Sequence, residues 1–331
     1  MKYLFFFVAI SFSFAASAST IYVSADAIAP NQADSWATAT TLHHALAIAT
    51  GEDQIWVKRG TYLTSAIGDR AASFVLPAGV AVYGGFAGTE SSLAARPVGT
   101  TSTLSGDLGR TGDVADNAYT VVIMRSNQAS ILDGFVLTGG NGRNFQEGFA
   151  PGNTGGALFI ERAPFGLSTH RISNCHFRNN QAHNGGAVYV NSGRPSFEGC
   201  TFIDNSADFN GGAIYNQGSG TEASPIFRNC EFLDNKSNYG AGMANNGTNG
   251  ASNPLIIECN FDNNVSVTEG SAIYNITFGT GVCEVVMEGC SFQGNMSILG
   301  GDVSGNGISP SIAERARQNS GGTLRPVRAK K

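Results

Sequence analysis

The residues in this sequence with the most reactive or polar side chains recur at a fixed period. Five cysteines lie 25, 30, 29 and 31 residues apart, and each begins a six-residue segment with phenylalanine third and asparagine sixth. The cysteines are Cys175, Cys200, Cys230, Cys259 and Cys290. The phenylalanines are Phe177, Phe202, Phe232, Phe261 and Phe292, and the asparagines are Asn180, Asn205, Asn235, Asn264 and Asn295. Because the segments keep one register, we expect each residue type to form a ladder along a stacked structure.

In an oxidising compartment, cysteines at this spacing can either stay thiols or form disulfides. Neighbouring strands lie about 4.8 Å apart, whereas the Cβ atoms of a disulfide are about 3.8 Å apart. A ladder of buried thiols is therefore favoured over bridges, although a bridge between Cys283, which lies outside the repeat, and Cys290 stays open. Metal binding would need a CxxC pair or matched histidines, and neither occurs.

Polysaccharide chemistry would need paired carboxylates or a positioned base. Hydrolysis uses two carboxylates about 5–9 Å apart on one face. Asp204 and Asp234 share a repeat position and Asp262 lies one place earlier, but all three fall in turns, where solvated Asp is common. Elimination from a uronate needs a Lys or Arg base, and Lys58 and Lys236 are the only lysines outside the two termini. We predict no catalytic residue and keep a lyase or hydrolase as the alternative.

The densest acidic stretch contains Asp107, Asp113 and Asp116. Oxygen ligands at these spacings could hold Ca²⁺, although the stretch lacks the EF-hand spacing and its glutamate. The other interpretation is a turn in which the aspartates cap their own backbone. Calcium is therefore the only cofactor that the sequence suggests.

A long interruption, residues 141–154, precedes the repeats. It contains Arg143, Asn144, Phe145 and Phe149, which could stack on and hydrogen-bond a sugar ring or a peptide. The other interpretation is a loop that only covers the core.

The elements that position these residues have a period of two. In Cys200–Phe202 and Ala187–Val190, alternate side chains can point inward while their neighbours face water. A small-residue motif follows each cysteine segment, beginning at Gly185, Gly211, Gly240, Gly270 and Gly300. Short strands joined by glycine and asparagine corners every ~30 residues predict an all-β chain wound as a right-handed parallel β-helix.

These motifs resemble the repeats of the polymorphic outer-membrane proteins, which are defined by GGA-[ILV] and F-x-x-N. Gly185–Val188 and Gly211–Ile214 match the first motif, and Phe177–Asn180 is the first of five matches to the second. The resemblance covers residues 155–302 and implies a pectin-lyase-like β-helix, in a family of secreted or surface-displayed passengers that includes adhesins. No translocator barrel follows the repeats, so export by a barrel of the same chain is not expected.

The chain divides into three parts. Residues 1–18 have a positive start, an apolar stretch and an A-x-A ending, which predict a signal peptide cleaved after Ala18. Residues 19–308 form one β-helix domain, with irregular coils over 19–154 and repeats over 155–302. Residues 41–50 form an amphipathic helix that caps it, with Thr38 or Thr40 as N-cap. Residues 309–331 form a basic, disordered tail that either shields the last coil or marks a truncation.

The first coils contain five expected strands: residues 54–57, 73–76, 80–83, 119–124 and 131–137. After Asp302 we expect no further strand. With a net charge of −5 and only 14% charged residues, the composition does not favour nucleic-acid binding. The sequence therefore predicts an exported, non-catalytic scaffold with an adhesin-like binding role or a structural role at the cell surface, without a transmembrane helix in the mature chain. Its expected partners are glycans or surface proteins of a host or the environment, and a glycan-binding module of the pectin-lyase-like fold is a further alternative.

Overall fold

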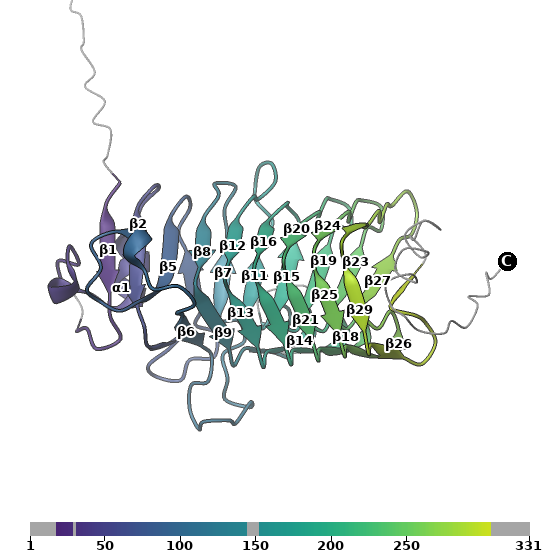
Figure 1. The fold of residues 1–331 in the computed structure, drawn as a ribbon, viewed down its shortest axis with the longest axis horizontal. Helices are drawn as coiled ribbons and strands as arrows, with labels where there is room; N and C mark the ends of the chain where they lie inside the picture. The colour runs from purple at the N-terminus through teal and green to yellow at the C-terminus, as the bar shows by residue number, and fades with distance from the viewer. Residues whose placement is uncertain (1–17, 29–30, 144–151, 306–331) are drawn as a thin grey trace, which may run out of the picture.

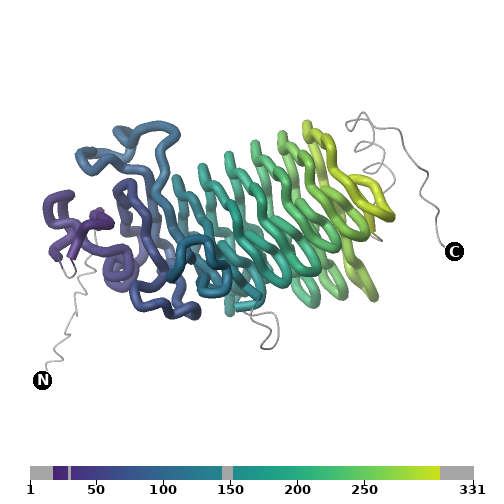
Figure 2. Tube along the Cα trace, turned by 90° about the horizontal axis from the view of Figure 1, so that it is seen from below, coloured from purple at the N-terminus to yellow at the C-terminus, as the bar shows by residue number. Residues whose placement is uncertain are grey.

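The computed structural model describes residues 18–28, 31–143 and 152–305. Within this part the chain winds into a parallel β-helix whose coils follow one another along the long axis from the N-terminal to the C-terminal end (Figure 1). Turned by 90°, the trace shows the coils side by side as in a spring (Figure 2). The strand pairs between described coils are parallel, and each strand inside a sheet bonds to its equivalents one coil before and one coil after.

The strands of the described residues form four sheets, which we name A to D. Sheet A contains β1 (Thr20–Val23), β2 (Gln54–Lys58), β5 (Ala81–Phe86), β8 (Ile131–Asp133), β12 (Arg171–Ser173), β16 (Ser196–Glu198), β20 (Ile226–Arg228), β24 (Leu255–Ile257) and β28 (Val286–Glu288). Sheet B contains β3 (Thr61–Leu63), β6 (Ser102–Ser105), β9 (Phe135–Thr138), β13 (His176–Arg178), β17 (Thr201–Ile203), β21 (Glu231–Leu233), β25 (Asn260–Asp262) and β29 (Ser291–Gln293).

The other two sheets complete each coil. Sheet C contains β4 (Phe74–Leu76), β7 (Val122–Met124), β11 (Leu158–Ile160), β15 (Val188–Asn191), β19 (Ile214–Gln217), β23 (Met243–Asn246), β27 (Ile273–Ile276) and β31 (Val303–Gly305). Sheet D contains β10 (Asn141–Gly142), β14 (Gln181–Asn184), β18 (Ser206–Asn210), β22 (Lys236–Tyr239), β26 (Val265–Glu269) and β30 (Met296–Ser297). A regular coil thus runs through sheets A, B, D and C in turn.

The corners of a coil are residues with a left-handed backbone. In the coil of β16 to β19 these residues are Gly199 (φ 58°), Asp204 (φ 53°) and Gly211 (φ 67°). Glycine adopts this conformation without strain, and Asp and Asn tolerate it better than most residues. Asp204 therefore occupies its corner because it tolerates the left-handed backbone there. This agrees with the turn role that the sequence favoured over catalysis.

The interior is filled by ladders of identical residues. The rings of the five repeat phenylalanines stack with centroids 4.4–5.2 Å apart. Four of the repeat asparagines are buried, and Asn295 at the C-terminal end is partly buried. Asn205 accepts from the Asn180 backbone and side-chain N–H groups and donates its own Nδ2–H to the Phe177 carbonyl. Such bonds satisfy backbone groups that a corner would otherwise leave unpaired inside the protein.

All six cysteines are buried, and none of them forms a disulfide. Their Sγ atoms lie near main-chain carbonyls, as in the 3.6 Å contact from Cys200 to Ile172. Burial raises the pKa of Cys283 and Cys290 to about 11, so both remain thiols at neutral pH.

One helix covers the N-terminal end of the coils. Helix α1 (Leu42–Ile48) buries Leu42 and Ala45 against β1, β2 and β4. Its N-cap is Thr41, whose hydroxyl accepts from the His44 N–H, so the expected caps Thr38 and Thr40 were wrong. Thr38 ends the short 3-10 helix η1 (Trp36–Thr38), and Thr40 bridges to Val23. A second 3-10 helix, η2 (Leu93–Ala95), lies in the loop after β5.

Three expectations for the strands need correction. The strand expected over 131–137 is two strands, because Gly134 turns the chain with φ 80° at the corner between sheets A and B. Strands β1, β3 and β6 in the first coils were not foreseen. A strand does follow Asp302: β31 pairs with β27 and is short and ends in glycine, which hid it. In the described part of the chain, no helix is long and apolar enough to cross a membrane.

Candidate functional site

A charged cluster lies on the outer face of sheet D, beside the interruption that the sequence singled out. The guanidinium of Arg143 lies 2.9 Å from the Asp208 carboxylate and also bonds to the side chains of Gln181 and Ser206. Asn144, Phe145 and Phe149, the other expected binding residues of this stretch, fall outside the described residues. Arg143 is therefore the one residue of that prediction whose surroundings are known.

A β-bulge builds this cluster. Strands β14 and β18 pair Ala182 with Ala207 but Asn184 with Asn210, so β18 has one more residue than β14 at this point. His183 therefore lies opposite two residues of β18, Asp208 and Phe209. Its Nδ1 lies 3.7 Å from the Asp208 carboxylate, and the centroid of its ring lies 4.2 Å from that of Phe209. A bulge commonly redirects side chains in this way. The result is an arginine, a carboxylate, an imidazole and a half-exposed phenyl ring on one surface.

A stripe of aromatic rings follows the outer face of sheet C. Phe159 stacks on Tyr189 with ring centroids 5.4 Å apart, and Tyr189 lies 5.4 Å from Tyr215. These three rings are buried, and burial raises the pKa of Tyr215 to about 12. The same outward position is occupied by Ala244 and then by Tyr274 in the following coils. We call Phe159, Tyr189, Tyr215 and Tyr274 the outer aromatic stripe.

The stripe becomes accessible at its C-terminal end. Tyr274 is half-buried, and its ring lies 4.9 Å from that of Tyr239, which comes from β22 of sheet D. Tyr239 is paired in register with Glu269 on β26. The pKa of Tyr274 is raised, first by burial and then by the charge of Glu269. We call Tyr239, Glu269 and Tyr274 the Tyr–Glu cluster.

The three aspartates expected to bind calcium cap their own loop. Asp107 accepts from the Gly112 N–H at 3.2 Å, Asp113 from Ala115 at 3.0 Å and Asp116 from Arg110 at 2.7 Å. Over residues 18–28, 31–143 and 152–305, no group of three or more His, Cys, Asp or Glu side chains is placed to hold a metal ion. The carboxylates therefore serve the loop that contains them, and calcium binding at these aspartates stays an untested expectation.

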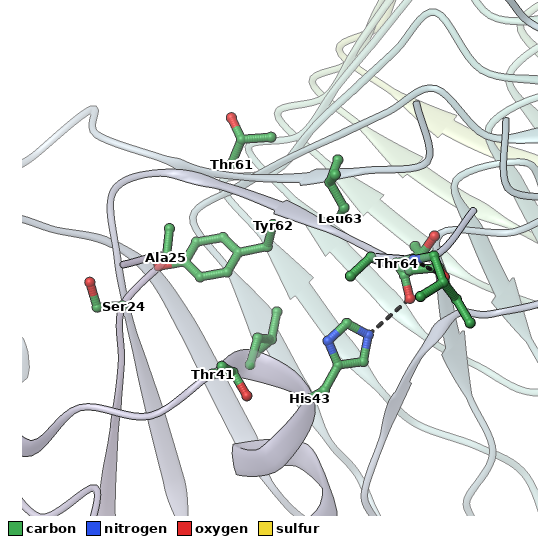
Figure 3. A pocket seen from close by; sticks show the side chains of 12 residues that line it. Ser24, Ala25, Thr41, His43, Thr61, Tyr62, Leu63 and Thr64 are labelled. Atoms are coloured by element: carbon green, nitrogen blue, oxygen red, sulfur yellow. Dashed lines mark hydrogen bonds between the residues drawn. The ribbon is translucent and has the colours of Figure 1, made fainter. Parts of the chain in front are cut away.

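A pocket of ≈ 500 Å³ lies between α1 and β3 (Figure 3). Leu42 and Tyr62 form part of its wall, and the ring of His43 lies within hydrogen-bond distance, 2.9 Å, of the Thr64 carbonyl. Tyr62 donates its hydroxyl to the Lys58 carbonyl. No carboxylate, ammonium or guanidinium group is among the described residues that line it. The pocket lies beside the contacts that hold the cap helix on β1, β2 and β4, and His43 and Tyr62 are its titratable lining residues.

One surface cluster and one buried ladder were not foreseen from the sequence. The Tyr–Glu cluster was missed because its members lie on two sheets and meet only through the register of the coils. A second inner asparagine ladder, Asn216, Asn245 and Asn275, has side-chain bonds of 2.7 and 2.8 Å. Its signal was present, since each asparagine follows the last residue of a small-residue motif by three positions.

Comparisons with known proteins address the fold. A family model described as "Right handed beta helix region" matches residues 114–292, more than half of the chain, and confirms the predicted right-handed parallel β-helix. No curated protein matches the sequence. Among solved structures, pectate lyase Pel9A is similar with a TM-score of 0.48 and 11% identity, over 89% of this chain and 82% of that chain. The enzymatically active domain of bacteriophage CBA120 tailspike protein 2 has a TM-score of 0.26 and 10% identity, over 82% and 40%. At this similarity neither structure informs the chemistry of the site.

Proposed function

The chain belongs to the family of right handed beta helix regions, and from that premise we propose that it is an exported, non-catalytic scaffold that binds glycans along one face. The observation that carries the proposal is the outer aromatic stripe, which ends in half-exposed tyrosines at the Tyr–Glu cluster. An aromatic ring offers an apolar face to the C–H groups of a sugar, while its hydroxyl group and neighbouring amides offer hydrogen bonds.

The rigidity of the surface favours binding of an extended chain. Tyr239 and Tyr274 stand on strands that pair on both sides with neighbouring coils. Their backbone therefore needs little reorganisation on binding, which reduces the entropic cost. The accessible part of the stripe is Tyr274, with Tyr239 beside it, and such a pair of rings can stack on a sugar of a polysaccharide chain.

Export and surface display belong to this proposal. They are supported by the apolar stretch and the A-x-A sequence of residues 1–18 and by the resemblance to polymorphic outer-membrane repeats. That resemblance also supports an adhesin-like role, in which the rod holds its binding face away from the cell.

A polysaccharide-degrading enzyme is the second candidate, and the Arg143–Asp208–His183 cluster favours it. A carboxylate, an imidazole and a guanidinium on one surface are the groups that acid–base chemistry uses. In this structure they are paired with one another, since Arg143 and His183 both face Asp208. We rank binding first because that pairing occupies the groups that would otherwise act on a substrate.

Titration calorimetry of the purified protein against neutral, acidic and amino polysaccharides tests the proposal. We expect binding to at least one of them, and Tyr274→Ala should weaken it about fivefold, because the ring loses its contact with the sugar. Tyr83→Ala is the matched control, since Tyr83 is also a half-buried tyrosine but lies on sheet A. It should leave the affinity unchanged.

The same samples decide between binding and catalysis. Ultraviolet absorbance by unsaturated products would reveal a lyase, and an increase in reducing ends would reveal a hydrolase. Either signal, if lost in Asp208→Asn, would replace the binding proposal by the enzymatic one. Equal loss of affinity in the Tyr274 and Tyr83 variants would place the binding face elsewhere.

A further inference from the structure

We propose that the Tyr–Glu cluster is a subsite for a protonated amino group, so that the glycan bound by this face contains amino sugars. The inference rests on the proposed function and specifies its ligand. It follows from the placement of two aromatic rings and one carboxylate on neighbouring coils.

The geometry brings the three side chains to one place. The rings of Tyr239 and Tyr274 have centroids 4.9 Å apart and planes inclined by 35°. Glu269 lies opposite Tyr239 in the β22–β26 ladder, and its carbonyl accepts from the N–H of Gly240 at 3.2 Å. All three residues are partly buried at the corner between sheets D and C. A ligand group at this corner would therefore meet ring surface and carboxylate together.

The carboxylate of Glu269 has no cationic partner among the described side chains. The ion pairs of that part of the chain involve Arg96, Arg125, Arg143, His183 and Arg194 and their acidic partners, and Glu269 is not among them. Its charge nevertheless acts at the cluster, because it contributes to the raised pKa of the Tyr274 hydroxyl. A partly desolvated anion without a partner attracts a cation more strongly than a fully hydrated one does.

The lysine on the neighbouring strand β22 makes no ion pair with Glu269 among the described residues. Lys236 begins β22 and is exposed, and it pairs in register with Val265, at the opposite end of β26 from Glu269. Val265 and Glu269 are four residues apart on β26, so their backbone positions are about 13 Å apart, beyond the screening length of about 8 Å in physiological salt. On the N-terminal side, Arg143 is already paired with Asp208.

These observations select among classes of sugar. A neutral sugar would contact the tyrosines but leave Glu269 unpaired, and a uronate would place a like charge beside it. A protonated amine is attracted by the ring faces and by the carboxylate at once. The geometry thus favours a glucosamine-type residue over a neutral or acidic one.

Two oligosaccharides that differ only at nitrogen test the inference. We would titrate the protein with a chito-oligosaccharide in its fully deacetylated form and in its fully N-acetylated form at pH 6. The deacetylated form should bind about tenfold more tightly in low salt, and the preference should shrink as salt is added. Glu269→Gln should reduce the preference about fivefold while leaving binding of the acetylated form unchanged. Glu231→Gln, an exposed glutamate on sheet B, is the matched control and should change neither.

Each other outcome overturns the inference, and the outcomes separate it from the proposed function. If both forms bind equally and Tyr274→Ala weakens both, the face binds glycans but Glu269 does not select an amine. If neither form binds while another polysaccharide binds in a Tyr274-dependent manner, the proposed function stands and the ligand class is wrong. Glu269-dependent binding of a lysine peptide, without binding of the amino sugar, would replace the glycan by a basic protein segment.

Discussion

His170 illustrates what burial in this fold does to a single titratable residue. Its side chain is completely buried, and its Nδ1 accepts a hydrogen bond from the Ser130 N–H at 3.2 Å. Burial lowers its pKa from 6.5 to about 4, because the imidazolium would lose its hydration. His170 is therefore neutral in the folded protein over most of the physiological range.

This lowered pKa predicts a pH-dependent stability. Between pH 6.5 and about 4 the unfolded chain binds a proton at this position more readily than the folded one. The free energy of unfolding should therefore fall by about 3 kcal/mol as the pH drops through that window, with full stability above it. His170→Asn keeps an acceptor for Ser130 but does not titrate. Urea unfolding at several pH values should show a weaker decline for this variant, and a constant difference from wild type above pH 7; parallel declines would contradict the assignment.

Some individual residues could be predicted from the sequence, whereas their contacts could not. The repeat positions of the phenylalanines and asparagines were visible because each recurs with the period of the coil. Arg143 was selected because aromatic and amide residues surround it in the sequence of the interruption over residues 141–154. Its contacts with Asp208 could not be predicted, because they depend on one extra residue in β18 that shifts the register. The Tyr–Glu cluster was unpredictable for a similar reason, since it joins residues from three strands.

At the scale of elements, the sequence showed a period of two in two kinds of segment, at the cysteines and after the small-residue motifs, whereas a regular coil has four strands. Strands of three or four residues leave too few alternating positions to give a clear period of two. The sheet A and sheet D strands of the repeats were therefore not distinguished from the corners around them, although β2, β5 and β8 of sheet A overlap expected strands. The cap helix was recognisable from its apolar spacing, yet its N-cap was displaced by one to three residues. Hydrogen bonding by Thr41 decides that boundary, and a threonine-rich stretch offers several equivalent choices.

Helix α1 gives a prediction at this scale. Leu42 is 2% exposed against the first coils, whereas Ile48 on the same helix is 45% exposed. Leu42→Ala should lower the stability of the N-terminal coils by about 2–5 kcal/mol, because it leaves a cavity under the helix. Ile48→Ala removes a similar side chain from the surface and should cost no more than about 0.5 kcal/mol. Thermal unfolding followed by fluorescence measures both, and equal effects would mean that α1 does not seal the end of the core.

For the whole molecule, the coils contact mainly their neighbours, so stability is transmitted along the axis from coil to coil. Both tryptophans of the chain, Trp36 and Trp56, lie in the N-terminal coils, where Trp56 stacks on Phe86 with ring centroids 4.7 Å apart. Their fluorescence therefore reports on one end of the rod, while circular dichroism reports on all of its strands.

This separation allows a test of cooperativity. Phe292→Ala removes the last ring of the phenylalanine ladder, which contacts Phe261 at 5.2 Å. The denaturation midpoint by circular dichroism should fall, since a buried Phe→Ala change costs about 3–5 kcal/mol. The tryptophan midpoint should fall less, because the damage lies many coils away. Coincident midpoints in the variant would show that the rod unfolds as a single unit.

The ladder residues of each regular coil match those of its neighbours, and this has a consequence for how the length of such a protein evolves. Because each coil presents the same phenylalanine and asparagine to both of its neighbours, a duplicated segment of about 30 residues fits between existing coils without a new interface. Each duplication would lengthen the rod by one strand spacing, and a duplication on the N-terminal side of β22 would also move the Tyr–Glu cluster one step further from the N-terminal end. The length of the rod can thus evolve by duplication of coils. The chemistry of the binding face changes independently, by substitution of outward-facing residues.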